Sequence, residues 1–234
     1  MTRILLVGYG RMGKLVESLA GDYGCEVAGI VDPLVGKDGV DSDRWKRVPG
    51  VPGIDIAIDF SAPDAVMTNV PALARRGFNV VVGTTGWGPH EPELRKIIAE
   101  TGVGIVAAPN FSTGVVAFEA IVAHAAKLLA PQTDFSAFLH EAHHQAKRDA
   151  PSGTALQLKD AVKSAGFSRP IDVSSTRAGY IPGTHTVGFD GPAETITLTH
   201  TARDRSAFAR GALTAAQWVK GRKGWFTMRD VLGL

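Results

Sequence analysis

The sequence predicts an α/β protein of two domains, and three patterns lead to this prediction. A glycine-rich segment, residues 8–13, stands between a short apolar run and a helix-like segment. Apolar strand-like runs and helix-like segments then alternate as far as about residue 112. Beyond residue 170, apolar and polar residues alternate with a period of two, as in strands with one covered face. These patterns are typical of a doubly wound parallel sheet followed by an α+β domain with a mixed or antiparallel sheet.

Composition limits the class of protein. A chain of 234 residues with 44% hydrophobic and 21% charged residues is typical of a soluble globular enzyme. A net charge of +2 does not favour nucleic acid as a partner. The single cysteine, Cys25, excludes an internal disulfide and suits a reducing compartment. No signal peptide stands at the start, and no apolar run reaches the ~18 residues of a membrane span, so we expect a cytoplasmic protein.

The glycine-rich segment indicates dinucleotide binding. It follows Ile4-Leu5-Leu6-Val7, an apolar run typical of a parallel strand that is buried on both faces. The three glycines permit a tight turn, let a pyrophosphate approach the backbone, and let the next helix pack on the strand. We therefore expect a Rossmann-type N-terminal domain whose phosphate loop consists of Gly8, Tyr9, Gly10, Arg11, Met12 and Gly13.

The second expected strand, residues 26–32, ends in an acid, Asp32. Asp32 lies roughly 20 residues beyond Gly13, which is the spacing of the carboxylate that binds the adenosine ribose. Alternatively, Asp32 caps a turn at the end of the strand. A carboxylate here favours NADH because it repels the 2′-phosphate of NADPH, whereas Lys37 in the next segment could offset that repulsion. The sequence therefore leaves NADH and NADPH both open as cofactors.

Three further strands are expected at residues 54–60, 79–83 and 104–108. Ligands of open α/β sheets bind beyond the carboxyl ends of the strands, so the residues at these ends should line the cofactor. Taken singly, each segment is equally compatible with an ordinary strand-to-helix turn. The candidate cofactor residues in them are Phe60, Gly83, Thr84, Thr85, Ala108, Pro109, Asn110 and Phe111.

The pattern changes after residue 112. A long apolar helix is expected over residues 114–129, followed by a strand over 135–140 and a helix over 152–165. Strands with alternating polarity then follow, and a last helix is expected from Arg205 to Lys220. The change places a domain boundary near residue 112.

The densest group of polar residues is the stretch from residue 140 to residue 154, which holds three of the seven histidines. Histidine changes its charge near neutral pH, so His143 can supply a proton. Lys147 can bind a carboxylate or supply a proton instead. A helix that begins near Ser152 would add free amides and the Thr154 hydroxyl, which together form an anion site.

The same stretch also fits a zinc-binding pattern. His140-Glu141-Ala142-His143-His144 matches H-E-x-x-H, which on a helix places two imidazoles on one face. The preceding residues 135–139 suit a strand better than a helix, and the sequence offers no obvious third ligand. We therefore expect no metal, and keep a zinc hydrolase that uses His140 and His144 as an alternative.

Glu141-Ala142-His143-His144-x-x-Lys147-x-Asp149-x-Pro151-Ser152-Gly153-Thr154-Ala155 closely resembles the signature of the 4-hydroxy-tetrahydrodipicolinate reductase family, also called dihydrodipicolinate reductase. Residues 83–86, 109–112 and 177–179 match the family pattern too, so the resemblance covers essentially the whole chain. Two positions depart from it. The phosphate loop is one residue shorter than the usual G-x-x-G-R-M-G, and His140 replaces an aliphatic residue.

The resemblance implies an enzyme that uses NADH or NADPH to reduce 4-hydroxy-tetrahydrodipicolinate, by way of dihydrodipicolinate, to tetrahydrodipicolinate. This reaction belongs to the diaminopimelate and lysine pathway. A reductase of another cyclic imine carboxylate and a non-catalytic nucleotide sensor stay open as alternatives, because a fold does not determine a function.

The resemblance also implies roles for domains and residues. Residues 113–204 would bind the substrate and form the contacts of a homotetramer, whereas residues 205–234 would return to the dinucleotide-binding domain of residues 1–112. His143 is the first candidate for the proton donor and Lys147 the second, with Glu141 or Asp149 orienting them. The candidates for binding the small dicarboxylate substrate are His144, Lys147, Ser152, Gly153, Thr154 and Arg205.

Overall fold

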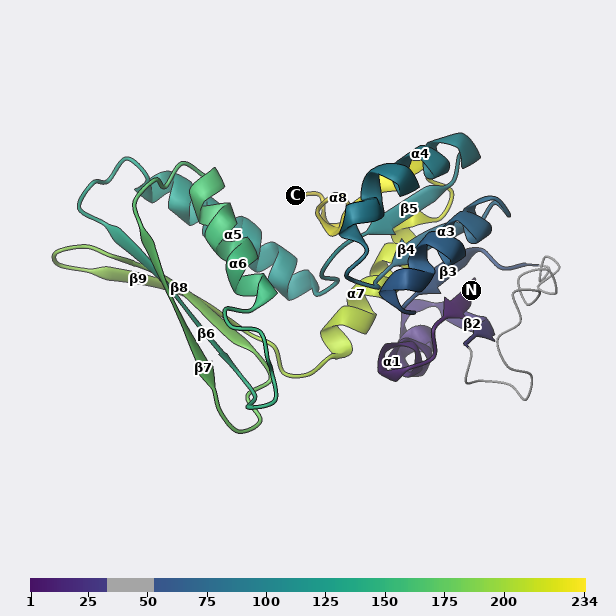
Figure 1. The fold of residues 1–234 in the computed structure, drawn as a ribbon, viewed down its shortest axis with the longest axis horizontal. Helices are drawn as coiled ribbons and strands as arrows, with labels where there is room; N and C mark the ends of the chain where they lie inside the picture. Colours follow the sequence, from purple (N-terminus) through teal and green to yellow (C-terminus); the bar gives the residue numbers. More distant parts are fainter. Residues whose placement is uncertain (33–52) are drawn as a thin grey trace. The chain divides into compact units, whose positions relative to one another are not determined.

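The computed structural model describes residues 1–32 and 53–234 and divides the chain into two compact units. One unit consists of Met1–Thr113 together with Ser206–Leu234, and the other consists of Gly114–Arg205. The C-terminal segment thus belongs to the same unit as the N-terminus (Figure 1). Within the described residues, no helix combines the length and the apolar character that crossing a membrane requires.

A parallel sheet of six strands forms the centre of the first unit, with the order β10-β5-β4-β3-β1-β2. Its inner strands are buried and apolar, as parallel strands covered on both faces must be. The strands are β1 (Thr2–Val7), β2 (Cys25–Val31), β3 (Ile56–Asp59), β4 (Asn79–Val82), β5 (Gly104–Ala107) and β10 (Gly224–Phe226). The expected doubly wound sheet is confirmed, with β10 as a strand that the sequence analysis did not predict.

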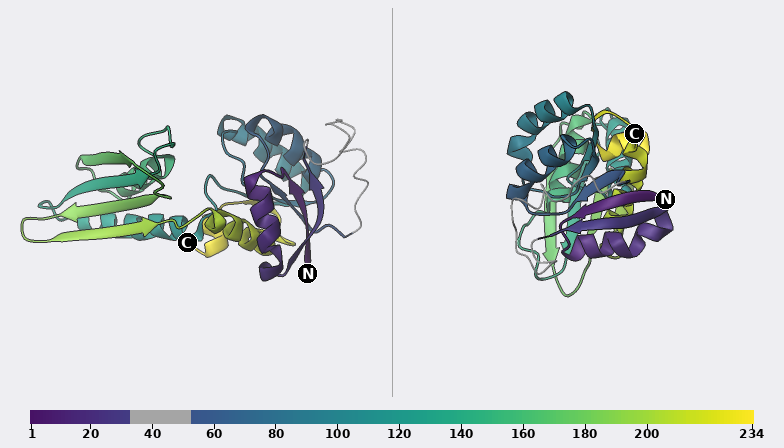
Figure 2. Two further views of the ribbon diagram at one scale, coloured as in Figure 1. Left: turned by 90° about the horizontal axis from the view of Figure 1, so that it is seen from below. Right: turned by 90° about the vertical axis from the view of Figure 1, so that its right-hand side faces the viewer.

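Helices cover both faces of this sheet. In Figures 1 and 2, α1 (Arg11–Ala20) and α7 (Ser206–Val219) pack together on one face. On the other face, α3 (Val66–Ala74) packs with α4 (Glu91–Thr101). The short elements of this unit are η1 (Gly21–Tyr23), η2 (Pro63–Ala65), η3 (Gly88–His90) and α8 (Met228–Leu232).

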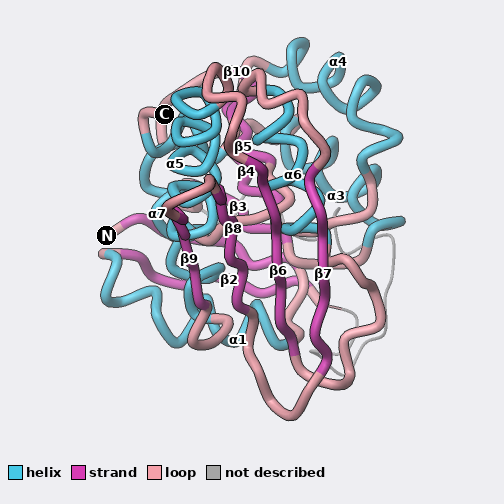
Figure 3. Tube along the Cα trace, turned by 90° about the vertical axis from the view of Figure 1, so that its left-hand side faces the viewer, coloured by secondary structure: helices cyan, strands magenta, loops and turns pink. Residues whose placement is uncertain are grey.

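The second unit is a four-stranded mixed sheet with helices on one face. In the order β7-β6-β8-β9, β6 and β7 are parallel and the other pairs antiparallel, which confirms the expected α+β class. Figure 3 looks onto the strands with α5 and α6 behind them. The core between the helices and the sheet includes Phe118, Leu158 and Phe189. The elements are α5 (Thr113–Leu129), β6 (Ser136–His143), α6 (Gly153–Ser164), β7 (Ile171–Arg177), β8 (Thr184–Asp190) and β9 (Thr195–Thr201).

Candidate functional site

The phosphate-loop glycines of the first unit differ in what surrounds them. Gly8 has φ of +88°, and a Cβ there would overlap the Phe60 carbonyl, whereas a Cβ on Gly13 would overlap the carbonyl of Gly8. In contrast, nothing lies within 4 Å of a Cβ built on Gly10. Gly8 and Gly13 are therefore needed for the turn and for packing. Gly10 leaves the backbone open to a close ligand, which is what a pyrophosphate requires.

The loop lies where the order of the parallel sheet reverses. β1 is flanked by β2 and β3, and ligands of open sheets bind beyond the carboxyl ends of strands at such a position. The amide of Gly8 donates to the carbonyl of Val31 at 2.8 Å, and the amide of Phe60 donates to the carbonyl of Val7 at 2.8 Å. These bonds join the ends of all three strands. Because α1 begins at Arg11 and has no acid in its first turn, its N-terminus stays available to a phosphate.

A buried acid at the end of β3, Asp59, organises two of the loops that carry cofactor candidates. Its side chain has no exposed surface, and Oδ1 accepts hydrogen bonds from the amide and hydroxyl of Ser61 and from the hydroxyl of Thr84. Oδ2 accepts a bond from Nδ2 of Asn69 at 3.2 Å. Asp59 was not among the predicted site residues, although a carboxylate that ends an apolar strand was the available signal.

Packing separates the cofactor candidates into two groups. Phe111 is only 2% exposed and meets the edge of Phe60, and a Cβ on Gly83 would overlap the Phe60 ring. The buried candidates are Gly8, Gly13, Asp32, Thr84, Ala108 and Phe111. Candidates with accessible surface are Tyr9, Gly10, Arg11, Met12, Phe60, Gly83, Thr85, Pro109 and Asn110.

Asp32 is held against the phosphate loop. Its Oδ2 accepts a 2.6 Å hydrogen bond from the amide of Tyr9, and the residue is 9% exposed. The carboxylate therefore ties the end of β2 to the loop, in addition to the ribose contact that its spacing predicts. Lys37, the candidate for offsetting the charge of Asp32, lies outside the described residues.

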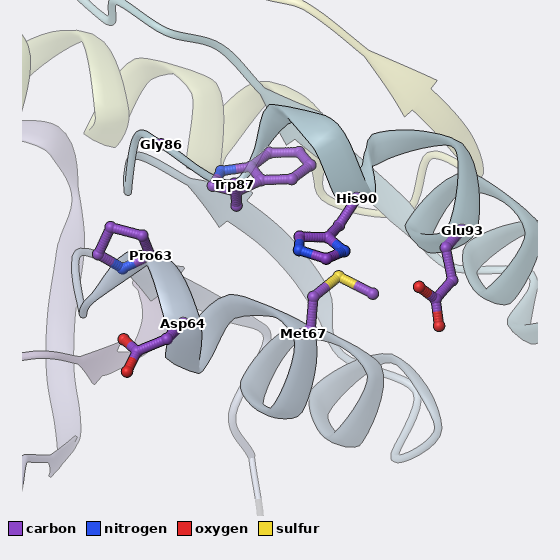
Figure 4. Close-up of a pocket in the computed structure, with 7 residues that line it drawn as sticks. All are labelled: Pro63, Asp64, Met67, Gly86, Trp87, His90 and Glu93. Carbon is purple, nitrogen blue, oxygen red and sulfur yellow. The ribbon is translucent and has the colours of Figure 1, made fainter.

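The first unit also contains a cavity of about 570 Å³ between the segments that follow β3 and β4 (Figure 4). Among the described residues that line it, Trp87 alone is buried. Its Nε1 donates to the carbonyl of Thr84 at 2.7 Å, so its polar atom is already paired. The cavity is lined by Pro63, Asp64, Met67, Gly86, Trp87, His90 and Glu93.

In the second unit, the polar network centres on Glu141, whose side chain has no exposed surface. Arg177 donates to Oε1 at 2.6 Å and to Oε2 at 2.8 Å, and the amide of Ser152 donates to Oε1 at 3.2 Å. Nδ1 of His143 lies 2.5 Å from Oε2. Burial favours the neutral acid, but the hydrogen bonds from Arg177 and its other partners outweigh burial and lower the pKa of Glu141 to about 2.

Strand pairing brings these groups together. The strand β6 continues to His143, so the expected end at residue 140 and the expected loop after it were wrong. The reason is that β7 and β8 pair with this segment on both sides, with Arg177 beside His143 and His185 beside Glu141. Alternation along β6 puts Glu141 and His143 on the same face as the core residue Leu139.

The proton positions on His143 follow from its partner. The Glu141 carboxylate is charged at neutral pH and can only accept, so Nδ1 of His143 carries a proton and Nε2 is the atom that exchanges one. Burial lowers the pKa of His143, and the interaction with Glu141 opposes this effect. Nε2 points toward the backbone at Gly183, where a Cβ would lie only 3.1 Å away.

His185 completes the cluster as a neutral imidazole. Its ring meets the ring of His143 edge to face at 5.1 Å between centroids. Burial, with the nearby His143 second, lowers the pKa of His185 to about 4. Its Nε2 is hydrogen-bonded to the hydroxyl of Ser152 at 2.9 Å. His185 was not among the predicted site residues.

The loop before α6 carries the remaining candidates. Nζ of Lys147 lies 2.7 and 2.9 Å from the two carboxylate oxygens of Asp149, so this lysine already holds an anionic group. Ser152 is buried and caps α6 by accepting a hydrogen bond from the amide of Ala155 at 3.2 Å. Gly153 is exposed and has open space where a Cβ would stand. The other substrate-binding candidates with accessible surface are His144, Thr154 and Arg205.

The structure does not have the helix that the zinc-binding alternative requires at residues 140–143. The H-E-x-x-H spacing places His140 and His144 on one face only in a helix, whereas His140 lies on the strand β6 and His144 follows the last residue of that strand. Nε2 of His140 is hydrogen-bonded to the hydroxyl of Thr176 at 3.0 Å. Within residues 1–32 and 53–234, His, Cys, Asp and Glu form no group of three or more that could hold a metal ion.

Comparison with known proteins decides the family. The model described as dihydrodipicolinate reductase, N-terminus, matches residues 2–111, and the one described as dihydrodipicolinate reductase, C-terminus, matches residues 114–232. This chain belongs to the dihydrodipicolinate reductase family. The resemblance of the 141–155 segment to this family is thereby confirmed.

Relatives agree over the full length. A protein of Methanosarcina barkeri named 4-hydroxy-tetrahydrodipicolinate reductase is 38% identical, with 96% of each chain covered. A protein of Christiangramia forsetii with the same name is 34% identical, with 98% of this chain and 97% of the relative covered. The solved structure of a dipicolinate-bound dihydrodipicolinate reductase from Paenisporosarcina shares this fold at 21% identity, with a TM-score of 0.80 and 98% of both chains covered.

Proposed function

We propose that this protein uses NADH or NADPH to reduce 4-hydroxy-tetrahydrodipicolinate, by way of dihydrodipicolinate, to tetrahydrodipicolinate in diaminopimelate and lysine biosynthesis. The observation that carries the proposal is the Glu141–His143 pair beside Lys147 and the start of α6, within the segment that resembles the family signature. Membership of the family and the open phosphate loop support it independently. The reaction takes place on a soluble metabolite, which suits the cytoplasm.

The first unit, residues 1–113 with 206–234, is the dinucleotide-binding part in this proposal. The open backbone at Gly10 and the first amides of α1 would hold the pyrophosphate, because the first N–H groups of a helix have no acceptor within the helix. Asp32 would bind the adenosine ribose. The segments around Phe60, Thr85 and Asn110 would line the nicotinamide half, which supplies a hydride when it is bound.

The second unit, residues 114–205, is the substrate-binding part in this proposal. Lys147, His144 and the first amides of α6 at Gly153 and Thr154 would bind a carboxylate, because oriented donors stabilise an anion better than mobile water does. Ser152 would contribute through the helix start that its hydroxyl caps. Arg205 would add a further positive charge.

His143 would donate the proton that completes the reduction. Hydride addition places electron density on the ring of the substrate, and a positioned acid that neutralises this density speeds the reaction. With Nδ1 bound to Glu141, the imidazolium donates through Nε2 and then returns to its neutral form. Lys147 is the second candidate for this role.

An absorbance assay tests the function. The purified protein should oxidise NADH or NADPH at 340 nm when the heterocyclic dicarboxylate is generated in the cuvette. A cyclic imine with a single carboxylate should react far more slowly, because the second anionic contact is absent. Equal rates with the two substrates would indicate a reductase of another class of imine. No oxidation with either substrate would contradict the proposal.

We also propose that the chain forms a homotetramer through the sheet face of the second unit that α5 and α6 leave uncovered (Figure 3). The hydroxyls of Thr184 and Thr201 and those of Thr186 and Thr199 pair across β8 and β9 on this side. Light scattering coupled to size exclusion should give about four times the monomer mass of 24.7 kDa. A mass that stays at one chain would contradict the proposal.

A further inference from the structure

Two side chains share one carboxylate oxygen of Glu141. Oε2 lies 2.5 Å from Nδ1 of His143 and also accepts a 2.8 Å hydrogen bond from Nη1 of Arg177. Arg177 donates to Oε1 as well, at 2.6 Å, so its planar guanidinium binds both oxygens. The carboxylate therefore reaches His143 in an orientation that Arg177 sets.

Arg177 is held in place from two further directions. Nη1 donates to the carbonyl of Thr176 at 2.8 Å, and Nη2 donates to the carbonyl of Asp149 at 2.6 Å. Strand pairing fixes its Cα beside that of His143, and its side chain is only 18% exposed. The guanidinium thus joins β6, β7 and the loop before α6, and its orientation is defined by the fold.

We propose that Arg177 is a positioning residue of the reductase, which acts on His143 through Glu141 and not on the substrate. By engaging both carboxylate oxygens, Arg177 limits how tightly Glu141 holds the imidazole proton at Nδ1 and keeps Nε2 as the atom that gives a proton away. The inference rests on the proposed role of His143 as the proton donor, and it adds the residue that adjusts the strength of this donor.

The charges around His143 give the direction of the effect. The groups that face it are Glu141 on its own strand, Arg177 on β7, His185 on β8, Lys147 and Asp149 in the loop before α6, and His200 on β9 beyond His185. Burial lowers the pKa of His143, Glu141 raises it, and the charges of Lys147 and Arg177 lower it. Removal of Arg177 takes away a positive charge near His143 and leaves the Glu141 carboxylate bound to His143 without a competing donor. Both changes favour the protonated imidazole and therefore raise the pKa of His143.

The direct test measures the protonation of His143 without an assay of the reaction. Deuterium exchange at the imidazole C2 position, followed by mass spectrometry across pH, gives a midpoint for each histidine. Arg177→Gln should raise the His143 midpoint by about one pH unit or more, as loss of a nearby charge does. Arg177→Lys should raise it less, because an ammonium keeps the charge but cannot bind both oxygens.

Arg169 provides the matched control in the same unit. Its guanidinium donates to the carbonyls of Leu129 and Ala130 and stacks on Phe167, away from the cluster. Arg169→Gln should leave the His143 midpoint unchanged. Equal His143 midpoints in the wild type and in folded Arg177→Gln would overturn the proposal.

A double variant covers the case in which Arg177→Gln alone fails to fold, since that change leaves Glu141 buried without its guanidinium. In Glu141→Gln with Arg177→Gln, both charges are absent. In the Glu141→Gln background, an Arg177 substitution should move the midpoint of His143 by less than about half of the shift that the same substitution produces with Glu141 present, because the route through the carboxylate is gone. Where Arg177→Gln alone does not fold, Arg177→Lys is compared in the two backgrounds instead. An undiminished shift would show that Arg177 acts directly and would overturn the proposal.

Steady-state kinetics separate positioning from substrate binding. At a pH low enough for His143 to be protonated in both enzymes, Arg177→Lys should lower kcat roughly tenfold and leave KM for the dicarboxylate unchanged, because the imidazolium is a weaker and less well positioned acid. A raised KM with unchanged kcat would mean that Arg177 binds the substrate, which contradicts the proposal. If the wild type reduces no dicarboxylate, the proposed function fails, while the exchange midpoints still decide whether Arg177 adjusts His143.

Discussion

Among the described residues, each unit has one carboxylate without exposed surface, Asp59 in the first and Glu141 in the second, and the two differ in their partners. Asp59 in the first unit accepts hydrogen bonds from hydroxyls, an amide N–H and a side-chain amide, all of which are neutral. Glu141 in the second unit is bound by the Arg177 guanidinium and by an imidazole that can become charged. Neutral donors fix the positions of loops, whereas a titratable partner links a carboxylate to proton transfer. In the proposed function, cofactor binding and proton transfer thus depend on two different buried carboxylates.

The largest expected effect is a loss of kcat when His143, the hydrogen-bonded partner of Glu141, is replaced. His143→Ala removes the proposed acid and should lower kcat roughly a hundredfold or more. Binding of NADH, measured by fluorescence titration, should not change, because His143 belongs to the other unit. An unchanged kcat would remove His143 from the mechanism and, with it, the contrast between the two carboxylates.

Replacement of each carboxylate by its amide compares the two anchors directly. Glu141→Gln leaves Arg177 without its anionic partner and should lower the free energy of unfolding by about 3–5 kcal/mol, as a broken buried ion pair does. Asp59→Asn replaces acceptors of neutral hydrogen bonds and should cost about 1–3 kcal/mol. Urea unfolding followed by circular dichroism measures both values. A larger loss for Asp59→Asn would reverse the comparison.

The same two variants should also differ in the ligand that they affect. Asp59→Asn should weaken the binding of NADH, since the loops at Ser61 and Thr84 lose their common acceptor. The affinity for pyridine-2,6-dicarboxylate, measured by calorimetry, should be unchanged in this variant. Loss of dicarboxylate binding alone would show that Asp59 does not order the cofactor loops.

Lys147→Ala tests the loop next to the Glu141 cluster. Among the described residues, the ammonium forms an ion pair with Asp149, which is largely exposed, so its loss should cost less than about 1 kcal/mol of stability. The variant should nevertheless raise KM for the dicarboxylate and lower kcat. Lys159→Ala on α6 serves as the control in the same unit. A Lys147→Ala enzyme with wild-type constants would exclude Lys147 from the site.

The comparison can also be sharpened by the dependence of stability on pH. The pKa of His185 falls to about 4 in the folded chain, so its contribution is fully present above pH 6.5 and is lost as pH falls toward 4. Glu141, whose pKa is lowered to about 2, adds a loss below about pH 4.5. Urea unfolding at pH 7, 5.5 and 4.5 should show the decline. In His185→Asn, the part between pH 6.5 and 4.5 should shrink.

Much of the fold could be predicted because local patterns are strong where strands are buried. Ile4–Val7 and the glycines after it predict strand, turn and helix together, and the alternation after residue 170 predicts a sheet with one covered face. The strand β10 was missed because three residues, Gly224–Phe226, are too few to show a period. The end of β6 was misplaced because histidine and glutamate do not mark a strand, and pairing with β7 and β8 determined its length.

The sequence by itself determined the family, the class of cofactor and the segment that holds the candidate catalytic residues, because these depend on residue types at short spacings. Only the tertiary structure decided the partners of those residues. Arg177 lies 36 positions from Glu141 in the chain, and Asp59 lies 25 positions from Thr84. A hydrogen bond depends on distances of a few ångströms, which strand pairing and burial establish between segments that no local pattern connects.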